Sequence, residues 1–160
     1  PARRREPRGG MMAARGGIGM GSEGDREVMD LARAVLEDLG VECDVRVMSA
    51  HRNPDEVAAY AAGAEAAGIR VLVAGAGLAA HLAGAVAART ILPVIGVPLE
   101  AGPLNGLDAL LSTVMMPKGV PVATVAIGSH GARNAGFLAA QILALADPEL
   151  GRRLKAKRRM

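Results

Sequence analysis

The sequence predicts a single α/β domain in which a central parallel sheet carries helices on both faces, giving three layers. Two observations lead to this prediction. Short apolar runs, typical of buried parallel strands, alternate with stretches in which apolar residues recur at helical spacing. The 160 residues suffice for one core, and neither an internal repeat nor a long linker divides them.

Five apolar runs are expected to form the strands. The first contains three glycines, which weaken strand propensity, whereas the other four contain several Val, Ile or Leu residues. The third is a short and nearly uninterrupted apolar run, as in parallel strands that are covered on both faces. In chain order, the predicted strands cover residues 14–20, 44–48, 70–74, 93–97 and 120–127.

Helices are expected between these strands. Ser22 and Asp25 match a loose capping box ahead of the first helix, and Gly40 is suited to end it. Pro54 fits the first turn of the second helix, with Asn53 as its N-cap. The predicted helices cover residues 23–39, 54–68, 79–89, 107–114 and 132–146, followed by a basic helix from 148. This rhythm favours a flavodoxin/Rossmann-like arrangement.

Positive charge is concentrated at the two ends of the chain. The net charge is +3, but ten of the 19 basic residues and one of the 16 acidic residues lie in 1–8 and 152–160. The ends therefore total +9 and the remainder −6, so we expect no nucleic-acid partner. We expect a disordered basic tail over 1–12, the α/β domain over 13–147 and a basic C-terminal helix over 148–160.

Composition limits the partners and the location. A mean hydropathy of +0.25 is high for a soluble monomer of this size, so we expect a homo-oligomer that covers apolar surface. The single cysteine, Cys43, excludes an intrachain disulfide and is expected to be a buried thiol. No apolar run approaches the roughly 18 residues of a membrane span, and no secretory signal is present, so we expect a cytoplasmic protein without a membrane partner.

Three strand-to-helix turns, at 21–25, 49–54 and 75–81, are expected at the carboxyl edge of the sheet, where open α/β folds bind ligands. The second places the imidazole of His51 beside the guanidinium of Arg52. The imidazole can move a proton near neutral pH, and the guanidinium is a permanent cation suited to phosphate or carboxylate. We therefore predict one pocket that all three turns line.

The glycines of the first and third turns allow other interpretations. Segments 19–24 and 75–80 match a dinucleotide fingerprint, but the second strand lacks the acidic residue that would bind a ribose, which disfavours NAD. Ser22 and the backbone N–H groups that follow form an anion site, although capping alone is an equal explanation. Asp25 could instead hold ribose hydroxyls.

The histidines have different expected roles. His51 is the candidate proton-transfer group, with a packed structural histidine as the alternative. His81 could face the same pocket, either touching a ligand or acting through a neighbour, and His130 is expected to be solvated. The three are too scattered for a metal site, and we expect neither metal nor cofactor. Ser49 has no acidic partner for a hydrolase triad.

Colinear motifs over about residues 18–150 resemble the class I PurE family, the 5-(carboxyamino)imidazole ribonucleotide mutases of de novo purine synthesis. The matching motifs include Met20-Gly21-Ser22 with Asp25, Ser49-Ala50-His51-Arg52 with Pro54, Ala74–Gly77 with Ala79–Leu82, and Pro93–Pro98. The resemblance implies a three-layer α/β subunit in a homo-octamer that uses no metal, ATP or biotin.

The resemblance also implies residue roles. The substrate would lose CO2, which C4 of the aminoimidazole ring would then capture, with His51 supplying and later removing a proton. Ser22 and Arg52 would bind the 5′-phosphate, and Asp25 the ribose hydroxyls. The residues implied at or near the CO2 pocket are Ser49, Gly75, Ala76, Gly77 and His81.

The chain departs from the family pattern at four positions. Gly24 replaces a serine, Leu78 a glycine, Ala83 a proline and Met115 a glutamine. Two other functions stay open: a carboxylase that uses free CO2, and a nucleotide-binding homologue whose catalysis is impaired. The His-Arg pair of the second turn favours class I over class II enzymes, which have His-Lys.

Overall fold

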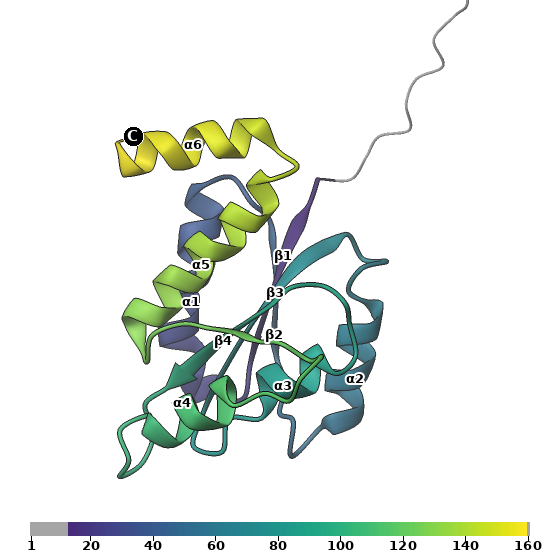
Figure 1. Cartoon of the computed structure of the whole chain (residues 1–160), viewed down its shortest axis with the longest axis vertical. Helices are drawn as coiled ribbons and strands as arrows, with labels where there is room; N and C mark the ends of the chain where they lie inside the picture. The colour runs from purple at the N-terminus through teal and green to yellow at the C-terminus, as the bar shows by residue number, and fades with distance from the viewer. Residues whose placement is uncertain (1–12, 160) are drawn as a thin grey trace, which may run out of the picture.

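The computed structural model describes residues 13–159 and contains one parallel sheet between two layers of helices (Figure 1). The strand order is β2-β1-β3-β4-β5, which is the flavodoxin-like order. This confirms the predicted fold class. The strands are β1 (Arg15–Met20), β2 (Cys43–Val47), β3 (Ile69–Gly77), β4 (Val94–Leu99) and β5 (Ala123–Thr124).

Helices cover both faces of the sheet. Helices α1 and α5 pack together on one face and α2 and α3 on the other, while α4 and α6 lie near opposite ends of the strands (Figure 1). The helices are η1 (Glu23–Asp25), α1 (Arg26–Asp38), α2 (Pro54–Gly63), α3 (Leu82–Ala87), α4 (Leu107–Val114), α5 (Ser129–Ala144) and α6 (Pro148–Arg158).

Two hydrophobic cores, one on each face of the sheet, follow from the alternation of side chains along the strands. In β3, Val71 and Val73 join the core beneath α1 and α5, whereas Leu72 and Ala74 join the core beneath α2 and α3. All four are almost fully buried. The apolar run that predicted a doubly covered strand therefore supplies both cores at once.

The glycine-rich first strand forms as predicted because neighbouring side chains occupy the space above its glycines. A Cβ on Gly17 would lie 2.5 Å from Leu72 Cδ2 and 2.7 Å from the Tyr60 hydroxyl. A Cβ on Gly19 would lie 2.8 Å from Met48 Cε. Tertiary packing thus compensates for weak strand propensity at these positions.

Two strands differ from their predicted ranges by more than two residues at one end. β3 continues past residue 74, because Gly75, Ala76 and Gly77 stay paired with β4. β5 contains two residues instead of the predicted 120–127, and it pairs only with Ile95 and Gly96. Pro121 has no N–H to donate to a ladder, which disfavours pairing at the beginning of the predicted range.

When η1 is counted with α1, three helices differ from the prediction by three or more residues at one end. α2 stops at Gly63, and the chain then turns to reach Gly68, which has a φ of 81°. α3 begins at Leu82 rather than at residue 79, because the N–H of His81 first donates to the carbonyl of Ala79 at 2.9 Å in a tight turn. α5 begins at Ser129, three residues earlier than predicted.

The basic helix predicted from residue 148 is present as α6. The Asp147 carboxylate caps it by accepting from two backbone N–H groups, and Leu150 and Leu154 are buried in the core that α1 and α5 share. Arg153 Nε donates to the carbonyl of Leu39 at 2.9 Å. The tail predicted over 1–12 lies outside the described residues. Within 13–159, no helix is both long and apolar enough to cross a membrane.

Candidate active site

The carboxyl edge of the sheet, at the bottom of Figure 1, holds a cavity of about 330 Å³. The three predicted turns converge on it, and the loop after β4 adds a fourth wall. The residues that line the cavity are Gly21, Ser22, Asp25, Ser49, Ala50, His51, Arg52, Ala76, Gly77, Leu78, Ala79, His81, Leu82 and Ala101.

The first turn is organised by the carboxylate of Asp25. Ser22, with extended backbone at φ −154°, donates its N–H and its hydroxyl to Asp25 Oδ2 at 3.0 and 3.1 Å. This is the predicted capping box, and it begins η1. Both residues also line the cavity, so capping and ligand binding are compatible.

The second turn is closed by its own side chains. Ser49 donates its N–H to Asn53 Oδ1 at 3.1 Å, and its hydroxyl accepts from the N–H of Arg52 at 3.2 Å. Asn53 occupies the predicted N-cap position of α2, but its side chain bonds back to Ser49 instead of capping the helix. These bonds fix the backbone that carries His51 and Arg52, whose side chains are exposed at the rim.

The third turn brings Ala76 and Gly77 to the cavity, but not Gly75. Gly75 is buried beneath it, where a Cβ would lie 2.2 Å from the sulfur of Met29 in α1. Gly75 therefore serves helix packing. Leu78 follows with a φ of +54° and lines the pocket.

Two histidines from different turns meet at the cavity. His51 Nε2 lies 2.5 Å from His81 Nδ1, and the two rings are nearly perpendicular, at 79°. A contact this short between two ring nitrogens requires one of them to carry a proton that the other accepts. Such a pair can hand a proton to a ligand and take one back. His51 is exposed and belongs to neither hydrophobic core, so it is not a packed structural histidine.

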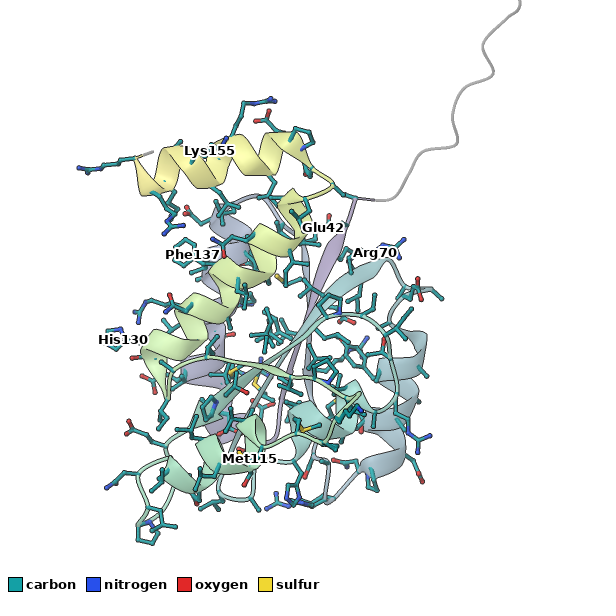
Figure 2. All side chains as sticks on the ribbon, viewed as in Figure 1. Glu42, Arg70, Met115, His130, Phe137 and Lys155 are labelled. Carbon is teal, nitrogen blue, oxygen red and sulfur yellow. The ribbon has the colours of Figure 1, made fainter. Side chains whose placement is uncertain are left out.

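His130 lies apart from the pair. It is exposed at the beginning of α5, as Figure 2 shows, and it does not line the cavity, in agreement with the prediction of a solvated side chain. Residues 13–159 contain no group of three or more His, Cys, Asp or Glu side chains with the arrangement of a metal site. The sole cysteine, Cys43, is only half-buried, at the start of β2.

The cavity gathers the other predicted site residues, namely Ser22, Asp25, Ser49, His51, Arg52, Ala76, Gly77 and His81. Sequence reasoning missed Ala101, in the loop after β4. The parallel pairing of Gly77 with Leu99 brings this loop beside the third turn. The position of this loop at the pocket could have been predicted, because the strands of a parallel sheet end at the same edge.

Fold and site together define a flavodoxin-like α/β protein whose carboxyl-edge pocket joins two imidazoles, a guanidinium and a carboxylate. These groups suit acid–base chemistry on a small anionic ligand. The sequence profile of the family described as AIR carboxylase matches residues 16–160. The chain belongs to the AIR carboxylase family.

Curated relatives are similar over most of their length. The N5-carboxyaminoimidazole ribonucleotide mutase of Bacillus subtilis is 55% identical over 142 residues, covering 89% of this chain and 88% of that protein. The protein of the same name from Escherichia coli K12 is 52% identical, covering 88% and 83%. The crystal structure of Treponema denticola PurE has a TM-score of 0.81 at 28% identity, covering 90% and 89%.

Proposed function

We propose that the chain is an N5-carboxyaminoimidazole ribonucleotide mutase, an isomerase of purine biosynthesis. The names of its relatives support this activity. The observation that carries the proposal is the contact of His51 with His81 in a cavity that Arg52 and Asp25 also line. The mutase reaction needs a group that moves one proton, a cation for a phosphate and an acceptor for sugar hydroxyls, and this cavity gathers all three.

The nucleotide is held by the first two turns. Arg52 and Ser22 bind the 5′-phosphate, aided by backbone N–H groups at the start of η1. Asp25 accepts hydrogen bonds from the ribose hydroxyls. Its Oδ2 is engaged by Ser22, and no described residue hydrogen-bonds its Oδ1, which leaves an acceptor for the sugar. The imidazole ring of the substrate is thereby directed toward the two histidines.

The reaction moves one carboxylate from the exocyclic nitrogen of the substrate to C4 of its ring. The bond between the exocyclic nitrogen and the carboxyl carbon breaks, CO2 leaves, and the electron pair stays on nitrogen, which takes a proton from His51. C4 of the ring then attacks CO2, and His51 removes the proton from C4. No proton is gained or lost overall. Hydrogen bonding to His81 keeps the His51 ring oriented through both steps, and Ser49, Ala76 and Gly77 line the space nearby.

A homo-octamer is the proposed assembly, and an exposed apolar face on α4 supports contact between subunits. Leu107, Leu111 and Val114 recur at helical spacing on α4, Leu104 and Met115 flank the helix, and these five exposed side chains are called the α4 face. Met115 is 77% exposed at the end of the helix and is labelled in Figure 2. Several exposed apolar side chains on one helix and its flanks are typical of an interface. We also propose that the protein is located in the cytoplasm, which agrees with its single free cysteine, Cys43.

A comparison of two substrates, each supplied separately, tests the proposal. Purified protein is given either the carboxyamino substrate or aminoimidazole ribonucleotide with bicarbonate, and the 4-carboxy product is measured against a blank without enzyme. A mutase forms product quickly from the first at low bicarbonate and slowly from the second. The reverse preference would indicate a carboxylase, and tight nucleotide binding without turnover would indicate an inactive homologue.

A further inference from the structure

Met29 packs α1 against the end of β3, directly behind the cavity. Its side chain is fully buried, and a Cβ on Gly75 would lie 2.2 Å from the Met29 sulfur and 2.8 Å from its Cε. The methionine therefore occupies the space that a side chain at residue 75 would need, and this close approach depends on glycine. Because Gly75 directly precedes Ala76, which lines the cavity, the contact sets the distance between α1 and the third turn.

The carboxylate of Asp25 meets the same stretch of β3 from the front. Asp25 lies one helical turn before Met29, so the two side chains project from the same side of the chain. Between Asp25 and β3 lies Gly21, on which a Cβ would be 3.6 Å from Asp25 Oδ2 and 3.8 Å from Cβ of Ala76. Gly21 also donates its N–H to the carbonyl of Gly75 at 3.2 Å. The position of the carboxylate relative to the third turn therefore depends on how closely α1 approaches β3.

We propose that Met29 is a positioning residue that holds the Asp25 carboxylate at hydrogen-bond distance from the ribose, an inference that rests on the ribose-binding role of Asp25 in the proposed function. Met29 does not line the cavity, so it acts through Asp25 and not on a ligand. A displacement of α1 by about 1 Å is enough to weaken hydrogen bonds to the sugar. We therefore expect changes at the Met29–Gly75 contact to impair recognition of the ribose hydroxyls.

The test compares the affinity for the 4-carboxy product nucleotide with the affinity for its 2′,3′-dideoxy analogue, both measured by calorimetry. The ratio of the two dissociation constants reports the bonds to the ribose hydroxyls, and a loss of stability alone does not change it in a folded protein. Met29→Ala removes the contact, Gly75→Ala adds a methyl group that displaces the methionine, and the double variant places that methyl group in the vacated space.

Leu36→Ala is the matched control. Leu36 is another fully buried residue of α1, and its Cδ1 would lie 3.2 Å from a Cβ on Gly16 of β1, so it also packs over a strand glycine. Neither Leu36 nor Gly16 lines the cavity. The control should therefore lower the melting temperature while it keeps the wild-type ratio of dissociation constants.

Each single variant should lower the ratio at least about threefold, and the double variant should recover it to within about twofold of wild type. If Met29→Ala does not fold, Met29→Leu, which keeps the volume but not the unbranched tip, takes its place and should also lower the ratio. An unchanged ratio in the single variants, an equal loss in Leu36→Ala, or a double variant without recovery would overturn the positioning role.

The wild type separates this inference from the proposed function. A wild type that prefers the product nucleotide over its dideoxy analogue but shows no turnover would overturn the mutase activity and leave the role of Met29 open to the same comparison of variants. A wild type that turns over substrate but binds both nucleotides equally would overturn ribose binding by Asp25, and the positioning role of Met29 with it.

Discussion

His51 Nε2 and His81 Nδ1 lie 2.5 Å apart, although thirty residues separate them in the chain. The contact joins the turn after β2 to the turn after β3, which leave the sheet on either side of β1. A hydrogen bond at this contact uses one nitrogen as donor and the other as acceptor, and the second nitrogen of each ring has no hydrogen-bond partner among residues 13–159. In the proposed mechanism, this partnership holds His51 in place while it gives and takes a proton.

Replacing His81 should lower the rate of the chemical step more than it weakens substrate binding. We expect His81→Phe, which keeps a ring but accepts no hydrogen bond, to reduce kcat by roughly 10- to 100-fold with KM within about twofold. His81→Asn offers an amide oxygen near the position of Nδ1 and should recover much of this loss. Steady-state kinetics of both variants is the measurement, and equal rates in the two would contradict a role through the hydrogen bond.

Replacing Arg52 should act mainly on binding. Loss of a charge-assisted contact to phosphate in Arg52→Gln is expected to raise KM by about one to two orders of magnitude. Arg52→Lys keeps the charge, so its KM should lie between those of Arg52→Gln and the wild type. The turn itself should survive, because Ser49 holds the backbone N–H of residue 52 and not its side chain. Arg133→Gln, an exposed arginine of α5 outside the cavity, is the control. A KM equal to that of the control would refute phosphate binding by Arg52.

A charge placed on the α4 face should disrupt the assembly. Leu111 is 52% exposed, and Leu111→Glu would bury a carboxylate if this face is an interface between subunits. Native mass spectrometry should show the wild type at eight subunits and the variant at a lower mass. Leu145→Glu alters a leucine that is 89% exposed at the end of α5 and should leave the mass unchanged. An octamer that persists in Leu111→Glu would show that the α4 face is not part of the interface.

The thiol of Cys43 should react slowly in the folded protein. Burial, with a smaller contribution from Glu37, raises its pKa from 9.0 to about 11. Near pH 8 the thiolate fraction, and with it the alkylation rate, should be roughly 100-fold below that of the unfolded chain. Because the unfolded chain releases this proton first, the thiol also lowers folding stability as pH rises from about 9 to 11. Labelling with iodoacetamide, with and without denaturant, measures the two alkylation rates, and equal rates would contradict the raised pKa of Cys43.

The sequence alone predicted the layers, the parallel sheet and most of the pocket, because periodicity and turn chemistry are local properties. It could not predict where β3 ends, since Gly75 to Gly77 look like a turn and are extended only through pairing with β4. The role of Gly75 was equally hidden, because Met29, which fills the space above it, comes from a distant helix. The His51–His81 contact depends in the same way on tertiary packing.

The family pattern identified Leu78 as a departure but could not predict its conformation. A leucine in the left-handed region contradicts local preference, so only the turn that the fold imposes reveals it. Its contact with Gly102 likewise depends on how two neighbouring strands end. Departures from local rules often mark functional sites, and here the departure lies in the wall of the candidate active site.

The most direct test of the central claim is the rate at which His51→Asn converts the carboxyamino substrate, measured beside its affinity for the nucleotide product. If His51 moves the proton, the rate should fall by at least about 1,000-fold while affinity and thermal melting stay close to those of the wild type. Turnover within about tenfold of wild type by a variant that still folds and binds nucleotide would contradict the account.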